Sequence, residues 1–178
     1  ALNIVGLSVT TPHKETVAAA VDQLSPVAMK LGAVNCVRRS GEVLIGENTD
    51  GKGFVESVRS GLGLEPGRSK VVVVGAGGAA RAVILALAEA GATIAVVNRT
   101  KDKAEKIVDQ MAMKNVSTSG FESISDADLV VQATSLGMGN DDPLPFDPNL
   151  IGKGQTLVDL IYHPERTPIV AAAAEHGA

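Results

Sequence analysis

The feature that most constrains the fold is an unbroken run of valines followed at once by a glycine-rich turn. Four valines follow Lys70, and residues 75–80 then read Gly-Ala-Gly-Gly-Ala-Ala. Continuous β-branched runs of this length are typical of strands buried on both faces of a sheet. An apolar pattern with helical spacing begins at residue 79 and reaches residue 90. The sequence therefore predicts a buried strand, a tight turn and a helix in direct succession.

The same alternation of strand and helix patterns continues to the last residues of the chain. The expected later strands are 93–97, 116–118, 129–133 and 156–160, and the expected later helices are 101–113 and 168–175. Strands that alternate with helices form a parallel sheet with helices on its faces. The sequence therefore predicts an α/β fold built on a Rossmann-type, doubly wound parallel sheet.

The first fifty residues follow a different pattern. We expect a strand at 3–10, helices at 14–23 and 26–31, and two extended runs, 33–38 and 42–46, joined by Ser40-Gly41 as in a hairpin. These elements are too few to close a core alone, and a further helix is expected from residue 50 to about residue 61. We therefore assign residues 1–49 to part of a second α/β domain and residues 50–178 to the domain with the parallel sheet.

Composition excludes several classes of partner. A net charge of −4 gives no long-range attraction for phosphate backbones, and an aromatic content of 2% leaves few rings on which bases could stack. We expect no nucleic-acid partner. The apolar runs are well short of the roughly 20 residues that cross a bilayer, and no leader pattern opens the chain. We therefore expect no membrane partner and interpret the chain as cytoplasmic.

The cysteine and histidine content argues against a disulfide or a metal site. The single cysteine, Cys36, cannot form an internal disulfide, and it lies in an apolar stretch that favours a buried structural thiol. No cluster of cysteine and histidine has the spacing of a zinc site. We therefore predict no metal. The oligomeric state stays open, with a homodimer as one option.

The glycine-rich turn predicts a dinucleotide site. Gly75, Gly77 and Ala80 match the pattern G-x-G-x-x-A. In that pattern the first glycine permits the tight turn, the second lets the backbone approach a pyrophosphate, and the small third residue lets the helix pack on the strand. Anions are then held at the helix N-terminus. The cofactor-binding residues predicted here are Gly75, Ala76, Gly77, Gly78 and Ala79.

The residues after the second strand favour NADP over NAD. An NAD site usually places Asp or Glu there, on the ribose hydroxyls, but this chain has Asn98, followed by Arg99 and Thr100. Lys101 and Lys103 lie close by in the sequence, so cations are offered where a ribose phosphate would bind. Thr100 is also the expected N-cap of the next helix. We predict that Asn98, Arg99, Thr100 and Lys103 contact NADP.

Three polar stretches outside the expected cofactor domain, with two later ones, resemble the shikimate dehydrogenase family. Residues 6–14 match its G-x-N-V-T-x-P-x-K motif except for Ser8 where Asn is usual. The motifs G-A-V-N and G-x-N-T-D-x-x-G are matched by residues 32–35 and 46–53. Residues 132–138 are similar to the family's N-A-T-x-x-G-M loop, with Gln132 in place of Asn, and residues 159–162 are similar to its D-x-x-Y segment.

The resemblance implies an activity and the residues that carry it. The activity is the reversible, NADP-dependent reduction of 3-dehydroshikimate to shikimate on the path to chorismate and the aromatic amino acids. The implied catalytic residues are Lys14 and Asp50, the implied substrate contacts are Thr10, Asn35 and Tyr162, and the further cofactor contacts are Thr134, Ser135 and Leu160. Residues 1–49 then form part of the shikimate-binding domain, and residues 50–178 form the NADP-binding domain.

The chemistry suits these residue types. Oxidation of a secondary alcohol leaves a hydroxyl proton, and an amine beside a carboxylate can accept or return it. An alternative has Asp50 carrying more of the proton transfer while Lys14 stabilises the developing alkoxide. The sequence leaves this division of roles open.

Two rival functions remain. One is a quinate/shikimate dehydrogenase that uses NAD, against which Asn98 and Arg99 argue. The other is a non-catalytic NADP-binding module, against which the retention of both Lys14 and Asp50 argues. Members of the family carry a segment before this chain's start and another after its end, which implies truncation at both ends. We therefore expect this chain to bind NADP but to turn shikimate over poorly.

Overall fold

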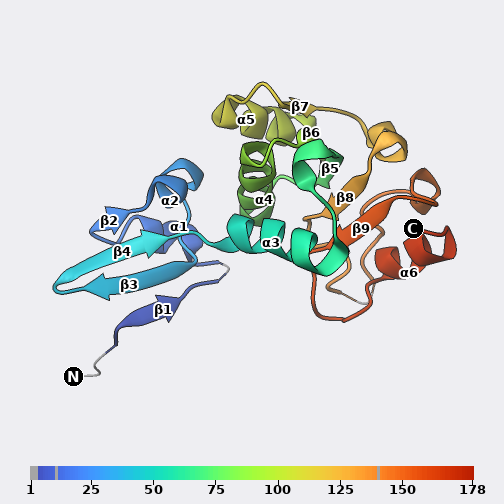
Figure 1. Ribbon diagram of the computed structural model, residues 1–178. Helices are drawn as coiled ribbons and strands as arrows, with labels where there is room; N and C mark the ends of the chain where they lie inside the picture. Colours follow the sequence, from blue (N-terminus) through green and yellow to red (C-terminus); the bar gives the residue numbers. More distant parts are fainter. Residues whose placement is uncertain (1–3, 11, 140) are drawn as a thin grey trace. The chain divides into compact units, whose positions relative to one another are not determined.

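The computed structural model describes residues 4–10, 12–139 and 141–178, which fall into two compact units, residues 1–54 and 55–178 (Figure 1). The first unit holds a four-stranded sheet in the order β1-β3-β4-β2, with β1 at Gly6–Ser8, β2 at Gln23–Leu24, β3 at Cys36–Ser40 and β4 at Val43–Glu47. Strands β3 and β4 form the expected antiparallel hairpin, and Gly41 adopts a φ of +62° in its turn.

Two short helices complete the first unit. They are α1 at Lys14–Ala18 and α2 at Pro26–Leu31. The Ser25 hydroxyl caps α2 by accepting from the Ala28 N–H at 3.2 Å, and Gly32 ends it in the left-handed region. A small core gathers on one face of the sheet around Ala28, Val34 and Val37.

The helix expected over residues 14–23 is five residues shorter than the prediction at its C-terminal end, and the short strand β2 was not predicted. Tertiary pairing is the reason. Gln23 and Leu24 pair in parallel with Ile45 and Gly46 of β4, so the chain has to leave the helix before residue 23. The Asp22 carboxylate supports this exit by accepting from the Leu44 N–H at 2.7 Å. Helix propensity is a weak prior that such pairing overrides.

The second unit confirms the predicted parallel sheet. Its five strands run in the order β7-β6-β5-β8-β9, and every pair is parallel. Their bounds are β5 Lys70–Val74, β6 Thr93–Val97, β7 Val116–Thr118, β8 Leu129–Gln132 and β9 Thr156–Asp159. The strand order reverses between β5 and β8, which is the point where doubly wound sheets place their ligands.

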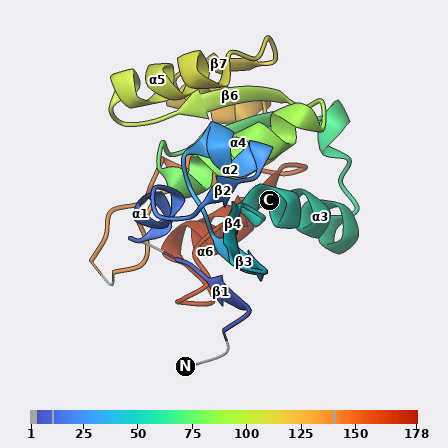
Figure 2. The same ribbon diagram turned by 90° about the vertical axis from the view of Figure 1, so that its left-hand side faces the viewer.

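Helices lie on both faces of this sheet. The helix α3 at Asp50–Leu62 begins in the first unit and ends in the second, and the others are α4 at Gly78–Glu89, α5 at Lys101–Met111 and α6 at Pro168–Glu175. Both views show α5 beside β6 and β7 (Figures 1 and 2). Three 3-10 turns, Pro66–Arg68, Phe121–Asp126 and Pro148–Leu150, were not predicted.

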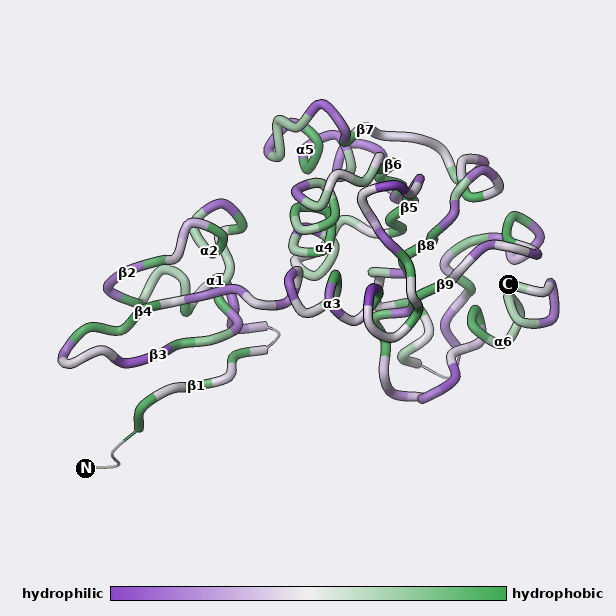
Figure 3. The backbone as a smooth tube through the Cα atoms, in the orientation of Figure 1, coloured by the Kyte–Doolittle hydropathy of each residue, from purple (hydrophilic) through white to green (hydrophobic). Residues whose placement is uncertain are grey.

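The valine run is buried on both faces, as predicted. Val72 and Val74 pack in a cluster with Ile124 and Ile169, while Val71 and Val73, which alternate to the other face, are also buried. Helix α4 packs on β5 and β6 and is hydrophobic along most of its length (Figure 3). Each buried valine is worth roughly 1.5–3 kcal/mol relative to exposure, so this strand anchors the turn that follows it.

Candidate functional site

The turn after β5 requires glycine at its first position. Gly75 has a φ of +127°, and a Cβ placed on it would lie 2.7 Å from the Ala133 carbonyl oxygen. Its N–H donates to the Val97 carbonyl at 2.8 Å, which ties the turn to the end of β6. The backbone of Gly75 therefore passes closely between the ends of the two neighbouring strands.

Gly77 has a different reason to be glycine. It is the N-cap of α4 with an extended φ of −93°, and a Cβ placed on it would meet no protein atom within 4 Å. The space in front of Gly77 is therefore open and available to a ligand. Ala80 is fully buried, as expected for the small residue at which the helix packs on the sheet.

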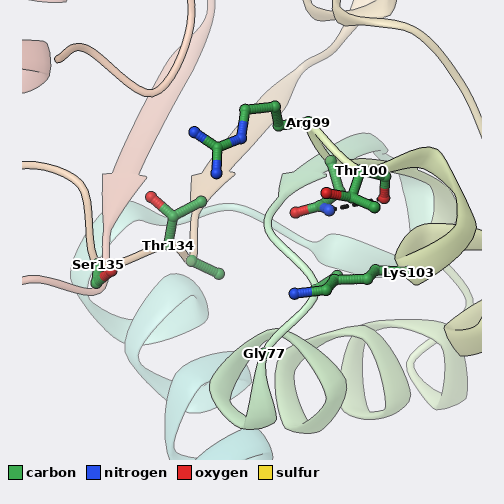
Figure 4. A pocket seen from close by; sticks show the side chains of 9 residues that line it. Gly77, Arg99, Thr100, Lys103, Thr134 and Ser135 are labelled. Carbon is green, nitrogen blue, oxygen red and sulfur yellow. Dashed lines mark hydrogen bonds between the residues drawn. The ribbon is translucent and has the colours of Figure 1, made fainter.

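A cavity of about 360 Å³ opens at the carboxyl ends of β5, β6 and β8 (Figure 4). Its lining residues are Ala76, Gly77, Asn98, Arg99, Thr100, Lys103, Ala133, Thr134 and Ser135. Figure 4 shows Arg99, Thr100 and Lys103 on one side of it and Thr134 and Ser135 on the other. The predicted contacts Gly75, Gly78, Ala79 and Leu160 are not among the lining residues, whereas Ala133 is an addition that the sequence reasoning missed.

The charge of this cavity is positive. Two cations, Arg99 and Lys103, line it, and no carboxylate is among its lining residues. Both side chains are exposed, and within the part of the chain that the structure describes neither forms an ion pair. The Asn98 side chain donates to the Thr100 carbonyl at 2.8 Å, which shapes the turn between them. This arrangement can bind an anionic group bearing several oxygens.

Two details differ from the expectation for this turn. Thr100 occupies the N-cap position of α5, but its side chain makes no capping hydrogen bond. Lys101 does not line the cavity, and its ammonium lies 3.4 Å from Glu105 along the helix. Arg99 and Lys103 are therefore the two cations that line the cavity.

The loop after β8 forms the opposite wall. Thr134 and Ser135 belong to it, and the Thr134 hydroxyl accepts from the Leu136 N–H at 3.1 Å. Further along, the Asp142 carboxylate accepts from the N–H groups of Gly139 at 2.9 Å and Gly137 at 3.1 Å. These backbone hydrogen bonds, from Gly139 first and then Gly137, lower the pKa of Asp142.

Leu160 and Tyr162 follow β9 in the second unit. The Leu160 N–H donates to the Gln132 carbonyl at 3.0 Å, and the Leu160 side chain is half-buried. The Tyr162 side chain is 91% exposed. Between them, the Ile161 N–H donates to Asp159, whose other carboxylate oxygen accepts from the Thr167 hydroxyl at 2.6 Å.

A second polar cluster lies in the first unit, and it brings together residues far apart in the sequence. The Lys14 ammonium lies 2.6 Å from Asp50 Oδ2, and the Asn35 amide donates to Asp50 Oδ1 at 2.6 Å. Both charged side chains remain partly exposed, Lys14 at 23% and Asp50 at 32%. An ammonium, a carboxylate and an amide therefore converge where a small polar ligand can reach them.

The backbone explains this convergence. The Val34 N–H donates to the Lys14 carbonyl at 3.0 Å, and the Asn35 N–H donates to the Glu47 carbonyl at 3.0 Å. These bonds hold the start of α1, the G-A-V-N stretch and the end of β4 against one another. Asp50 is the first residue of α3, and two residues separate it from the end of that strand.

Two neighbouring residues of the G-x-N-T-D-x-x-G motif, which were not among the predicted site residues, also bond to the cluster. The Asn48 side chain donates to the Ala33 carbonyl at 3.1 Å and accepts from the Asp50 N–H at 3.2 Å. Thr49 bonds to both polar atoms of the Asn35 amide. Its N–H donates to Asn35 Oδ1 at 2.9 Å, and its hydroxyl accepts from Asn35 Nδ2 at 3.0 Å. Asn48 and Thr49 belong to the G-x-N-T-D motif, and this membership was the sequence signal that could have assigned them to the site. Thr10 is exposed, and its backbone carbonyl accepts from the His13 N–H at 2.9 Å.

Over residues 4–10, 12–139 and 141–178, no three or more His, Cys, Asp or Glu side chains gather as a metal site would need. None of the helices in these same ranges combines the length and the apolar character that a bilayer crossing demands.

Comparison with known proteins identifies two family models along the chain. Residues 61–137 match the model described as shikimate / quinate 5-dehydrogenase, and residues 1–37 match the shikimate dehydrogenase substrate binding domain. Among curated proteins, NADP(+) shikimate dehydrogenases of Geobacter metallireducens and Bacillus mycoides are 35% and 37% identical. The alignments cover 99% and 100% of this chain but 65% and 67% of those proteins, so the chain spans about two thirds of their length.

A solved structure is similar over the same extent. The shikimate 5-dehydrogenase of Thermus thermophilus, in complex with NADP(H) and shikimate, superposes with a TM-score of 0.90 at 35% identity. The match covers 99% of this chain and 66% of that one.

Proposed function

This chain belongs to the shikimate dehydrogenase family, and from that membership we propose that it carries the NADP-dependent, reversible reduction of 3-dehydroshikimate to shikimate. One observation carries the proposal: Lys14, Asn35 and Asp50 meet within hydrogen-bonding distance although the sequence separates them. The similarity to relatives named for this reaction supports it.

The division of labour follows the two domains proposed from the sequence. Residues 1–49 supply Lys14 and Asn35 of the polar cluster and form part of the shikimate-binding domain, and residues 50–178 hold the cavity and bind NADP. Asp50, the third member of the cluster, is the first residue of α3 and lies in the first compact unit, although α3 itself continues into the second.

The cavity fits NADP by its chemistry. Gly77 leaves open space before the N-terminus of α4, where a pyrophosphate is stabilised by the helix dipole and free N–H groups. Arg99 and Lys103 supply the charge for a ribose phosphate, and no lining carboxylate repels it. Bound there, NADPH supplies the hydride for the reaction.

The chain's own residues manage the proton. When a substrate carbonyl becomes an alcohol, its oxygen needs one proton, and the Lys14 ammonium can donate it. In the reverse direction the Lys14 amine accepts the hydroxyl proton as the alcohol is oxidised. Asp50 orients Lys14 through the 2.6 Å contact and balances its charge, while Asn35 holds the other carboxylate oxygen. Thr10 and Tyr162 are proposed to contact the substrate hydroxyls.

The test is a spectrophotometric assay of NADPH formation with shikimate and quinate, each against NADP and NAD. We expect oxidation of shikimate with NADP. Lys14→Ala is expected to abolish the reaction. Lys30→Ala, which alters an exposed lysine on α2, is the matched control and leaves it unchanged.

Other outcomes of this assay contradict the proposal. Activity with quinate and NAD alone assigns the chain to quinate oxidation instead. NADPH binding without oxidation of either acid assigns it to a non-catalytic NADP-binding module. We further propose a cytoplasmic location, where a biosynthetic enzyme meets NADPH, and a homodimer, which light scattering of the purified chain tests.

A further inference from the structure

Gln132 is an unusual residue for its position. Only two polar side chains are buried in the described part of the chain, those of Gln132 and Thr167, and Gln132 is 0% exposed. It is the last residue of β8, in register with Val74 of β5 and Asp159 of β9, in the middle of a sheet whose interior is apolar. A buried amide is costly unless its oxygen and nitrogen both find partners.

Among the residues that the structure describes, the Gln132 side chain bonds only to the loop that follows it. Its Oε1 accepts from the Thr134 N–H at 2.6 Å, and its Nε2 donates to the carbonyls of Leu136 at 3.0 Å and Thr134 at 3.4 Å. The amide therefore binds the loop by its donor and its acceptor at once. A carboxylate of the same size has no donor for the Leu136 carbonyl, and an apolar side chain serves neither group.

The loop held in this way is a wall of the cavity. Ala133, Thr134 and Ser135 line the cavity. Thr134 and Ser135 lie opposite Arg99 and Lys103 (Figure 4). The Ala133 carbonyl also lies close to Gly75, the first residue of the glycine-rich turn. The path of residues 133–136 thus decides where the Thr134 and Ser135 hydroxyls stand relative to a bound dinucleotide.

We propose that Gln132 is the positioning residue of the NADP site: its buried amide holds loop 133–136 in the conformation that binds the dinucleotide. The inference rests on the proposed function for the identity of the ligand. Gln132 itself does not line the cavity, so it acts through Thr134 and Leu136.

The chain offers a matched control for this role. Gln155 precedes β9 at the opposite, amino-terminal edge of the sheet, and its amide makes the same kind of bonds to backbone. Its Nε2 donates to the Ile124 and Ala127 carbonyls at 2.6 and 2.7 Å, and its Oε1 accepts from the Gly152 N–H at 2.9 Å. Gln155→Met therefore removes a comparable set of amide-to-backbone hydrogen bonds at a place away from the cavity. It measures the effect of that loss on stability alone.

The experiment compares the intact 178-residue chain with its Gln132→Met and Gln155→Met variants. NADPH binding is measured by fluorescence titration, stability by urea unfolding, and protection of the Thr134 and Leu136 amides by hydrogen exchange. Both variants are expected to lose stability. Only Gln132→Met is expected to raise the Kd for NADPH, by about tenfold, and to lose protection at both amides without ligand.

A further variant guards against misfolding. Gln132→Asn keeps an amide but is one methylene shorter, so its Kd is expected to lie between those of the unchanged chain and Gln132→Met. If Gln132→Met does not fold, the Kd of Gln132→Asn for NADPH tests the positioning role by itself. A Kd equal to that of the unchanged chain in every Gln132 variant that folds, or an equal rise in Gln155→Met, overturns the positioning role.

The two proposals fail in different ways. If the unchanged chain binds NADPH and the Gln132 variants bind it equally well, the positioning role falls and the proposed function stands. If the unchanged chain does not bind NADPH, the proposed function falls, and the positioning role falls with it.

Discussion

The Lys14 ammonium lies 2.6 Å from the Asp50 carboxylate although the two residues are 36 positions apart in the sequence. Lys14 opens α1 and Asp50 opens α3, so two helix starts supply the pair. Asn35 donates to the other oxygen of Asp50, so each carboxylate oxygen accepts one hydrogen bond. We therefore propose that the ammonium, and not the carboxylate, exchanges a proton with a ligand.

Asp50→Asn is predicted to disable this arrangement without unfolding the chain. The amide keeps the shape but removes the charge that orients and balances Lys14, so kcat for shikimate oxidation falls roughly 10²–10⁴-fold. Glu47→Gln is the control, because it also removes one carboxylate charge from an ion pair of the first unit. Glu47 pairs with Arg38 at 2.7 Å between β4 and β3, and this pair is exposed. Steady-state kinetics with circular dichroism of each variant provide the measurement.

A double variant tests whether the pair acts as one unit. Lys14→Met with Asp50→Asn is predicted to lose little more activity than Lys14→Met alone, because coupled residues are not additive. Independent, additive losses would contradict a shared role.

Cofactor discrimination is predicted to depend on Arg99 and Lys103. Removing either side chain by alanine substitution should raise the Kd for NADPH by about tenfold while leaving that for NADH unchanged, because only NADPH carries the ribose phosphate. Lys101→Ala, whose lysine pairs with Glu105 outside the cavity, should change neither. Fluorescence titrations at two salt concentrations check this, and equal effects on both cofactors would refute it.

The two glycines of the turn are predicted to respond differently to alanine. Gly75→Ala combines a φ of +127° with a Cβ 2.7 Å from a carbonyl oxygen, so it should cost about 3 kcal/mol of folding free energy or more. Gly77→Ala meets no protein atom and should fold normally, yet weaken NADPH binding, because its methyl group enters the ligand's space.

The stability control for these glycines is Gly61→Ala on α3. A Cβ there also meets nothing, and the helix should gain up to about 1 kcal/mol. Urea unfolding and NADPH titration of all three variants separate the two effects. A Gly75→Ala variant as stable as the unchanged chain would show that the turn can rearrange.

Asp142 is predicted to stabilise the loop after β8 at neutral pH. Its folded-state pKa is lowered, chiefly by the Gly139 N–H and then that of Gly137, so its contribution is complete above the ordinary aspartate pKa and is lost as pH falls through the lowered one. Asp142→Asn should therefore reduce stability by a constant amount above about pH 5 and by less in more acid solution. Urea unfolding across pH measures this, with the exposed neighbour in Asp141→Asn as the control.

Much of the second unit was predictable because its signals are local. A valine run, a glycine turn and a helical pattern each depend on neighbouring residues, and strands 70–74, 93–97 and 116–118 were predicted to the residue. The first unit was less predictable. Strand β2 exists only because β4 lies beside it, and residues 14–23 alone carry no trace of that partner.

The candidate sites divide in the same way. From sequence alone came the residue types: a glycine with no room for a side chain, cations in place of a carboxylate after the second strand, and a lysine and an aspartate in separate motifs. Tertiary structure alone decided which of them meet. Lys103 lines the cavity whereas Lys101 does not. Lys14 and Asn35 each donate to one oxygen of Asp50. The buried amide of Gln132 lies behind the cavity wall that it bonds to. Local patterns encode strands and turns, whereas contacts between residues far apart in the chain depend on strand pairing and packing that no single segment specifies.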